Sequence, residues 1–304
     1  MKTAVIAVEP VIQNIEPVAK RSKSFEAYSR LVQLFQNKGL IPRSSVVSMI
    51  HSSLYLVPLS WYAENEGRYA GEAKHEIERL CKGRFNFEFI KVLRASASSN
   101  HYLVEQLSKY LNRMRSDLLV VLSSNRSGIP YWFLGSFSET AAFTSDCPVL
   151  VFKPHAKESD FSRSVRILVA IDAAASYSAR ERRWIIELAK SANAHIDLVY
   201  AKPPRGKIVE SVRLPKDEQL GEVALASFVS DLKKAGVSTS LAVLKDSDSI
   251  AEAIVDYAEK RQSWMIVTIS TQRKLARKLL LGSTARRILS LTKRPFLSLR
   301  LGKN

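Results

Sequence analysis

Residues 279–299, LLLGSTARRILSLTKRPFLSL, contain a Gly-Ser pair followed by a helical pattern, then a proline and a short apolar run. This order is typical of the last helix and last strand of an α/β domain, with the Gly-Ser pair opening the helix. Residues 132–152, WFLGSFSETAAFTSDCPVLVF, repeat the order, and each position lies 147 residues before its counterpart. The chain is therefore predicted to contain two copies of one domain.

The same offset aligns landmarks outside these stretches. The aligned pairs are Pro148 with Pro295, Tyr110 with Tyr257, Ser116 with Ser263, and DLLVVLSS with WMIVTIST. Because these pairs align without a gap, they support a duplication over the second half of each copy.

The first halves of the copies differ in length. TAVIAVE aligns with RILVAID at a longer offset, so that Glu9 falls on Asp172, whereas the second strands align His51 with Tyr200. We therefore predict an insertion at about residues 10–23, between the first and second strands of the first copy. It leaves the sheet at the edge where ligands bind, either as a lid over a ligand or as a plug that replaces one.

Short apolar runs alternate with helical spacing in each copy, which predicts parallel strands covered by helices on both faces. In the second copy this pattern places strands at 166–171, 195–201, 238–244, 264–269 and 296–300, and helices at 177–191, 218–235, 249–261 and 283–292. The predicted fold is two tandem, doubly wound domains, each with a five-stranded parallel sheet. We place them at 1–153 and 165–304, with a polar linker at 154–164.

Composition narrows the class of protein. The 304 residues are 46% hydrophobic, and the two Cys fall in different halves, which suggests a reducing, cytoplasmic location without disulfides. No apolar run approaches the roughly 18 residues of a membrane span. The net charge of +17 is uneven, with 20 Lys and Arg against 15 Asp and Glu in residues 1–160, but 26 against 14 in 161–304. The basic second half is either a solvated surface or one that binds phosphates.

The motif order resembles one family. VAID ends a first strand, an apolar fourth strand precedes a loop, and Gly-Ser leads to a last strand such as CPVLVF, as in the universal stress protein family. The resemblance covers nearly the whole chain, twice. It implies Rossmann-like domains of the adenine nucleotide α-hydrolase type, packed as an intramolecular pseudo-dimer through CPVLVF and RPFLSL. It also implies an ATP site built from an Asp after strand one and a loop of the form G-x-x-G, nine residues, G-[ST].

At the positions of this acid and this loop, the resemblance gives two sets of candidate cofactor-binding residues. They are Glu9, Ser123, Asn125, Gly135 and Ser136 in the first copy, and Asp172, Lys274, Gly282, Ser283 and Thr284 in the second.

The G-x-x-G glycines are replaced in both copies. Leu122 and Asn125 stand at these positions in the first copy, and Ile269 and Gln272 in the second. A Cβ here intrudes where sugar and phosphate need to approach bare backbone. Both sites are therefore predicted to be degenerate and not to bind ATP in the family's mode. An adenine nucleotide bound differently, or another phosphate-bearing ligand, stays open as the cofactor.

The two Gly-Ser corners differ in charge. Ser136 and Glu139 have capping-box spacing in the first copy, whereas cations surround the second corner: Arg273, Lys274, Arg277, Lys278, Arg286 and Arg287. Arg286 and Arg287 in a first helical turn oppose the helix dipole unless an anion is close. We expect an anion preference in the second copy, or else that these arginines point into solvent.

Enzymatic classes find no support in the sequence. The five His show no metal-ligand spacing, Cys81 and Cys147 lie in no redox motif, and neither GxxxxGK[ST] nor GxSxG occurs. The prediction is a non-catalytic stress-response binding or signalling protein that acts through a protein partner. The alternative is an anion- or nucleic-acid-binding protein that uses the basic second domain. It is less favoured because no aromatic residues interleave with the basic residues at 273–294.

A further apolar run follows the second strand of the first copy, in the sequence SLYLVPLSWY at 53–62. Either it covers its own domain or it contacts a second chain in a homodimer.

Overall fold

The computed structural model describes residues 1–8, 18–50, 58–96, 99–122, 137–153, 156, 161, 164–172, 177–201, 216–244, 249–269 and 278–301. Contacts divide the chain into two units, Met1–Glu158 and Ser159–Asn304. The division falls inside the segment 154–164 that the sequence suggests as a linker. Each unit is described by itself.

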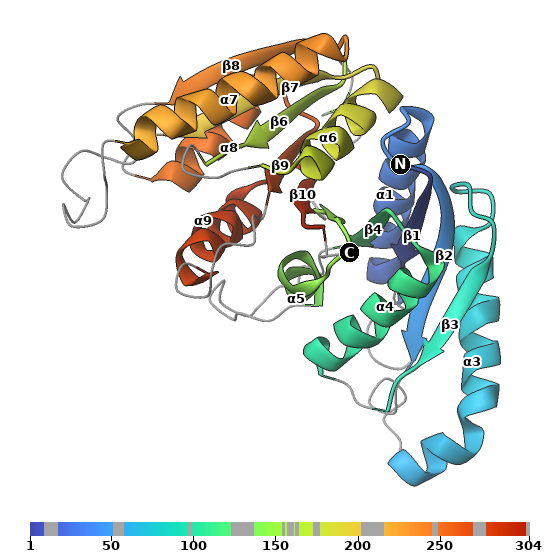
Figure 1. Ribbon diagram of the computed structural model, residues 1–304. Helices are drawn as coiled ribbons and strands as arrows, with labels where there is room; N and C mark the ends of the chain where they lie inside the picture. The colour runs from blue at the N-terminus through green and yellow to red at the C-terminus, as the bar shows by residue number, and fades with distance from the viewer. Residues whose placement is uncertain are drawn as a thin grey trace. The chain divides into compact units, whose positions relative to one another are not determined.

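The first unit alternates strands and helices in one parallel sheet, with helices on both faces (Figure 1). Its strand order is β3-β2-β1-β4-β5. The elements are β1 Thr3–Ala7, α1 Val18–Asn37, β2 Arg43–Ile50, α3 Leu59–Cys81, β3 Ile90–Arg94, α4 Asn100–Met114, β4 Leu118–Leu122, α5 Phe137–Thr144 and β5 Val149–Phe152.

The second unit repeats this architecture with the strand order β8-β7-β6-β9-β10. Its elements are β6 Arg166–Ala170, α6 Ala179–Ser191, β7 His195–Ala201, α7 Lys216–Lys234, β8 Thr239–Leu244, α8 Ile250–Lys260, β9 Met265–Ile269, α9 Lys278–Leu291 and β10 Phe296–Leu299. The predicted fold class, two five-stranded doubly wound α/β domains in tandem, is therefore confirmed. All predicted elements of this unit are present, although α9 begins at Lys278 instead of residue 283.

Strand register tests the repeat. Leu119 pairs with Val149, and Ile266 pairs with Phe296, which places β4 and β5 on β9 and β10 at the offset read from the sequence. The first strands agree as well, because Ala4 pairs with Leu118 as Ile167 pairs with Met265.

The alignment of His51 with Tyr200 is wrong. Thr3 pairs with Arg43 while Arg166 pairs with His195, so Arg43 and His195 are equivalent and Tyr200 corresponds to Ser48. The error is a slip along similar apolar runs, since β2 ends at Ile50 and His51 follows it.

The extra residues of the first copy lie partly in a helix. Helix α1 has 20 residues where α6 has 13, so residues 18–23 of the predicted insertion belong to the first turns of α1. The insertion is therefore shorter as a loop than expected. Residues 10–17, on which the lid and plug interpretations rest, lie outside the described residues.

Aromatic side chains fix two segments that the sequence left open. Phe161, inside the suggested linker, is buried with its ring 5.2 Å from that of Trp264, which begins the approach to β9. Tyr62 is buried against Tyr69 of its own helix α3, with stacked rings 5.8 Å apart. Tyr62 thus packs within its own domain, whereas residues 51–57 of the same apolar run lie outside the described part.

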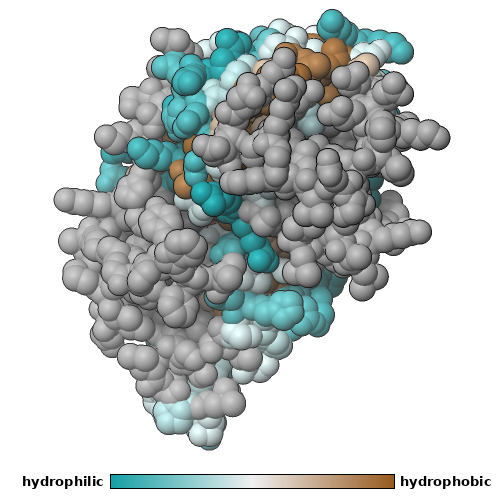
Figure 2. Space-filling view, turned by 90° about the vertical axis from the view of Figure 1, so that its left-hand side faces the viewer, coloured by the Kyte–Doolittle hydropathy of each residue, from teal (hydrophilic) through white to brown (hydrophobic). Residues whose placement is uncertain are grey.

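Exposed apolar side chains are scattered over the described surface. In Figure 2, among the residues drawn in colour, apolar surface occupies small areas between hydrophilic ones. The large apolar side chains that are exposed are Trp61 of α3, Phe89, Met114 of α4, Leu241 and Val243 of β8, and Leu291 of α9. Within the described residues, a partner would therefore meet a mixed surface of polar and apolar groups.

Candidate functional sites at the two edges of the sheet

The carboxyl edge of each sheet is where ligands bind in open parallel α/β folds. Six candidate residues of this edge lie outside the described part of the chain: Glu9, Ser123, Asn125, Lys274, Gly135 and Ser136. The structure describes Asp172 and Thr284, and the backbone of Gly282 and Ser283.

The backbone of Asp172, just after β6, is hydrogen-bonded to the side chain of Tyr177. Its backbone N–H donates to the Tyr177 hydroxyl at 2.6 Å, and that hydroxyl lies 3.2 Å from the Asp172 carbonyl oxygen, to which it can donate. Tyr177 is itself buried, and its ring lies 5.8 Å from that of Phe228. These contacts hold a half-buried Asp at the carboxyl edge, where the resemblance places the acid of the nucleotide site.

Leu122 and Ile269 are the last residues of β4 and β9. Leu122 pairs with Phe152, and Ile269 pairs with Leu299 and is 6% exposed. Each stands where the resemblance places the first glycine of the loop. In both copies the strand therefore ends in a branched apolar residue at the position where the resemblance expects the loop to begin.

The prediction that Gly282 and Ser283 open the last helix is wrong. Helix α9 already begins at Lys278, so both residues lie in its second turn. In an α-helix only the first four N–H groups lack an intrahelical partner, so these two amides are not the free ones. The cause is local sequence, because the Leu residues at 279–281 are strong helix formers and extend the helix toward its N-terminus. In the first copy α5 begins at Phe137, directly after Gly135 and Ser136.

Arg286 and Arg287 also lie beyond the first turn of α9, so the expected penalty from the helix dipole does not apply. Arg287 donates to Glu252 of α8 at 2.7 Å. The positions of these two arginines therefore do not indicate an anion preference in the second copy. The neighbouring cations Arg273, Lys274 and Arg277 lie outside the described residues.

A charged cluster that sequence reasoning missed lies at the opposite, amino edge of the second domain. Asp197 of β7 is fully buried, and Arg166 of β6 donates to both of its carboxylate oxygens at 2.9 Å. Ser240 of β8 donates a short hydrogen bond to the same carboxylate, and Arg261 lies 3.7 Å from it. The one available signal was an Asp inside an otherwise apolar strand, a position that needs a partner.

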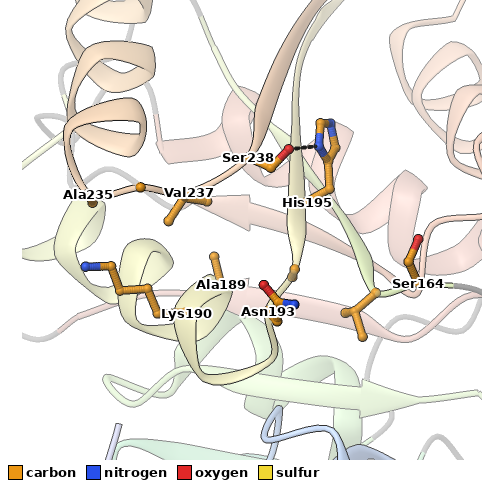
Figure 3. Close-up of a pocket in the computed structure, with 11 residues that line it drawn as sticks. Ser164, Ala189, Lys190, Asn193, His195, Ala235, Val237 and Ser238 are labelled. Atoms are coloured by element: carbon orange, nitrogen blue, oxygen red, sulfur yellow. Dashed lines mark hydrogen bonds between the residues drawn. The ribbon is translucent and has the colours of Figure 1, made fainter.

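His195, the first residue of β7, joins this cluster. Its Nε2 lies 3.2 Å from the Asp197 carboxylate, and its Nδ1 lies 2.7 Å from the Ser238 hydroxyl (Figure 3). Burial lowers the pKa of His195, as does Arg166, and Asp197 only partly offsets them. For Asp197 burial raises the pKa, but hydrogen bonds from Arg166 and Ser240 outweigh it and hold the pKa below its ordinary value. Both shifts favour an ionised Asp197 beside an uncharged His195.

Acid is expected to weaken the second domain through His195. Its folded-state pKa lies below the ordinary value of 6.5, so as pH falls the unfolded chain takes up the proton first. The contribution is complete above that value and is lost as pH falls toward the folded pKa. His195→Gln should therefore reduce the loss of stability between neutral pH and about pH 5 in urea unfolding. His75→Gln, exposed on α3, is the control, and an equal change in both variants would contradict the assignment.

A cavity of about 390 Å³ opens beside this cluster, between the turn that follows α6 and the turn that follows α7 (Figure 3). Its lining residues are Ser164, Val165, Ala189, Lys190, Asn193, Ala194, His195, Ala235, Gly236, Val237 and Ser238. It lies at the amino edge, away from the predicted nucleotide corner.

The described residues contain neither a metal site nor a membrane-spanning helix. No group of His, Cys, Asp and Glu there could hold a metal ion. None of the helices searched in that part is both long and apolar enough to span a membrane.

Comparison with known proteins agrees with the fold. Residues 165–300 match the sequence model of the Universal stress protein family. The whole chain is similar to the crystal structure of a universal stress protein from Archaeoglobus fulgidus DSM 4304, with TM-score 0.61 and 16% identity over 98% of this chain and 97% of that one. A putative universal stress protein from Pseudomonas aeruginosa UCBPP-PA14 has TM-score 0.53 and 14% identity over 98% and 93%. No curated protein sequence matches the chain. Residues 165–300 therefore form a universal stress protein domain, within a chain whose tandem fold is that of solved universal stress proteins.

Proposed function

We propose that the protein is a non-catalytic binding or signalling protein of the universal stress protein type, which acts in the cytoplasm through a protein partner. In this proposal neither nucleotide corner takes ATP in the family's mode. The observation that carries it is Ile269, a branched apolar residue 6% exposed at the end of β9, where the family loop begins with glycine.

Two further observations support the same conclusion for the second corner. Gly282 and Ser283 lie inside α9, so their amides already have partners in the helix. Arg287 pairs with Glu252 at 2.7 Å, so a phosphate would compete with that carboxylate for it. In the first corner, Leu122 at the end of β4 supports the proposal in the same way as Ile269. Packing of the two domains as a pseudo-dimer remains a prediction.

Thermal unfolding of the full chain with excess ATP, ADP or inorganic phosphate tests this function. We expect no change in Tm with ATP. A ligand at a hundredfold excess over its Kd would instead stabilise the fold by about 2.7 kcal/mol.

The variant Thr284→Glu serves to locate any binding that appears, because its carboxylate would repel the phosphates of ATP. An ATP-dependent rise in Tm that Thr284→Glu abolishes would place ATP in the second corner and overturn the proposal. Leu122→Glu makes the same test for the first corner.

A further inference from the structure

The cavity at the amino edge of the second domain has an apolar floor. Its buried members are Val165, Ala189, Ala194 and Val237. Figure 3 shows Ala189 of α6 next to Val237, which precedes β8. An aliphatic side chain that reached this floor would exchange water for contact with these apolar residues.

The two turns around the cavity have fixed backbones. Asn193 and Gly236 have positive φ of 47° and 75°, the left-handed conformation that ends a helix. The N–H of Ala194 donates to Ala189 at 2.8 Å, and the N–H of Val237 donates to Leu232 at 2.9 Å. The cavity is therefore preformed, which lowers the entropic cost of binding.

The rim of the cavity is cationic. Lys190 lines it, and Lys233 and Lys234 directly precede the lining residues of the second turn; all three side chains are exposed. None of the described lining residues is acidic. Two carboxylates close to these turns are engaged elsewhere, because Asp197 is buried against Arg166 and Asp231 pairs with Arg182 at 2.7 Å. Lysines in the last turn of a helix also interact favourably with the helix dipole. That interaction does not explain why an apolar floor lies between them.

We propose that this cavity and its lysine rim bind an acidic segment of a partner protein. An aliphatic side chain of the segment enters the cavity, and its carboxylates lie on Lys190, Lys233 and Lys234. The inference rests on the proposed function, for which it names the surface and the chemistry of the partner. A protein segment suits the site better than a nucleic acid, because the described lining residues include no Phe, Tyr or Trp, and the ring of His195 is already engaged by Ser238 and Asp197.

Fluorescence anisotropy with the full chain and synthetic probes tests the site. The probes are a labelled peptide rich in Asp and Glu with a central Leu, the same peptide with Ala in place of Leu, and single-stranded DNA of equal charge. We expect the Leu peptide to bind roughly tenfold more tightly than the Ala peptide, because only the former fills the cavity. Equal affinities of the two peptides, tighter binding of DNA, or no peptide binding would each overturn the inference.

Paired charge reversals locate the binding. Lys190→Glu with Lys234→Glu should weaken the Leu peptide by about tenfold or more, since attraction at two rim positions becomes repulsion. Arg183→Glu with Arg286→Glu changes the net charge equally at exposed positions away from the cavity and should change the affinity by less than about twofold. Equal weakening by both pairs would show a non-specific charge effect and overturn the inference.

The Tm measurements with ATP and the anisotropy measurements together distinguish the two proposals. An ATP-dependent rise in Tm would overturn the proposed function and leave the difference between the peptides unchanged. Loss of that difference, without any response to ATP, would overturn the amino-edge site alone.

Discussion

Replacing Asp197 with Ala is expected to lower the free energy of unfolding of the second domain by about 3–5 kcal/mol. The carboxylate is fully buried and receives both hydrogen bonds of Arg166, so its removal leaves that guanidinium without a counter-charge. Ser240 loses its acceptor at the same time, which loosens β8 at the edge of the sheet. Urea unfolding followed by tryptophan fluorescence measures the change.

Asp231→Ala is the matched control. Asp231 also pairs with an arginine, Arg182, at 2.7 Å, but its side chain is 35% exposed. Water can replace the lost partner there, so the expected cost is below about 1 kcal/mol. If both variants lost the same stability, the burial of Asp197 would not be the source of the effect.

Trp264→Ala is the second change with a large expected effect, about 3–5 kcal/mol. The side chain is 0% exposed just before β9, and its loss leaves a cavity in the core of the second domain. Trp61→Ala removes the same atoms from an indole that is 45% exposed on α3 and should cost less than about 1 kcal/mol. The midpoints of thermal unfolding of the two variants, compared with the unmodified chain, decide between these values.

The same substitution has a local consequence for residues 154–164. Phe161 packs on Trp264 with the rings 5.2 Å apart, so Trp264→Ala should free this segment as well as weaken the core. Limited proteolysis is expected to cut near Phe161 faster in Trp264→Ala than in Trp61→Ala. Equal cutting rates would mean that Phe161 is not held by this contact.

The fold was predictable because its signals are local. Each buried strand is a short apolar run, and each helix repeats apolar residues at helical spacing, so the sequence suffices to find them. The duplication fixed the alignment of β4 and β5 with β9 and β10, and the observed register of Leu119 and Ile266 agrees. Where runs look alike, as around His51, the sequence alone allowed a slip.

The candidate sites were less predictable, for two reasons. The start of α9 depends on how far helix-forming residues carry it before Gly282, which a motif centred on that glycine does not reveal. The cluster around Asp197 gathers Arg166, Ser240 and Arg261 from separate elements, and no spacing along the chain relates them. Such contacts depend on tertiary structure, so they appear only once the strands are ordered.

The ion cluster also divides the two halves in their response to acid. By strand register Asp197 corresponds to Ser45 in the first domain, a residue that carries no charge to titrate. Acidification therefore removes a stabilising interaction from the second domain, whereas the equivalent position in the first domain has no group to protonate. We expect acid unfolding in two separate transitions, with a half-folded intermediate between them in which residues 1–158 persist.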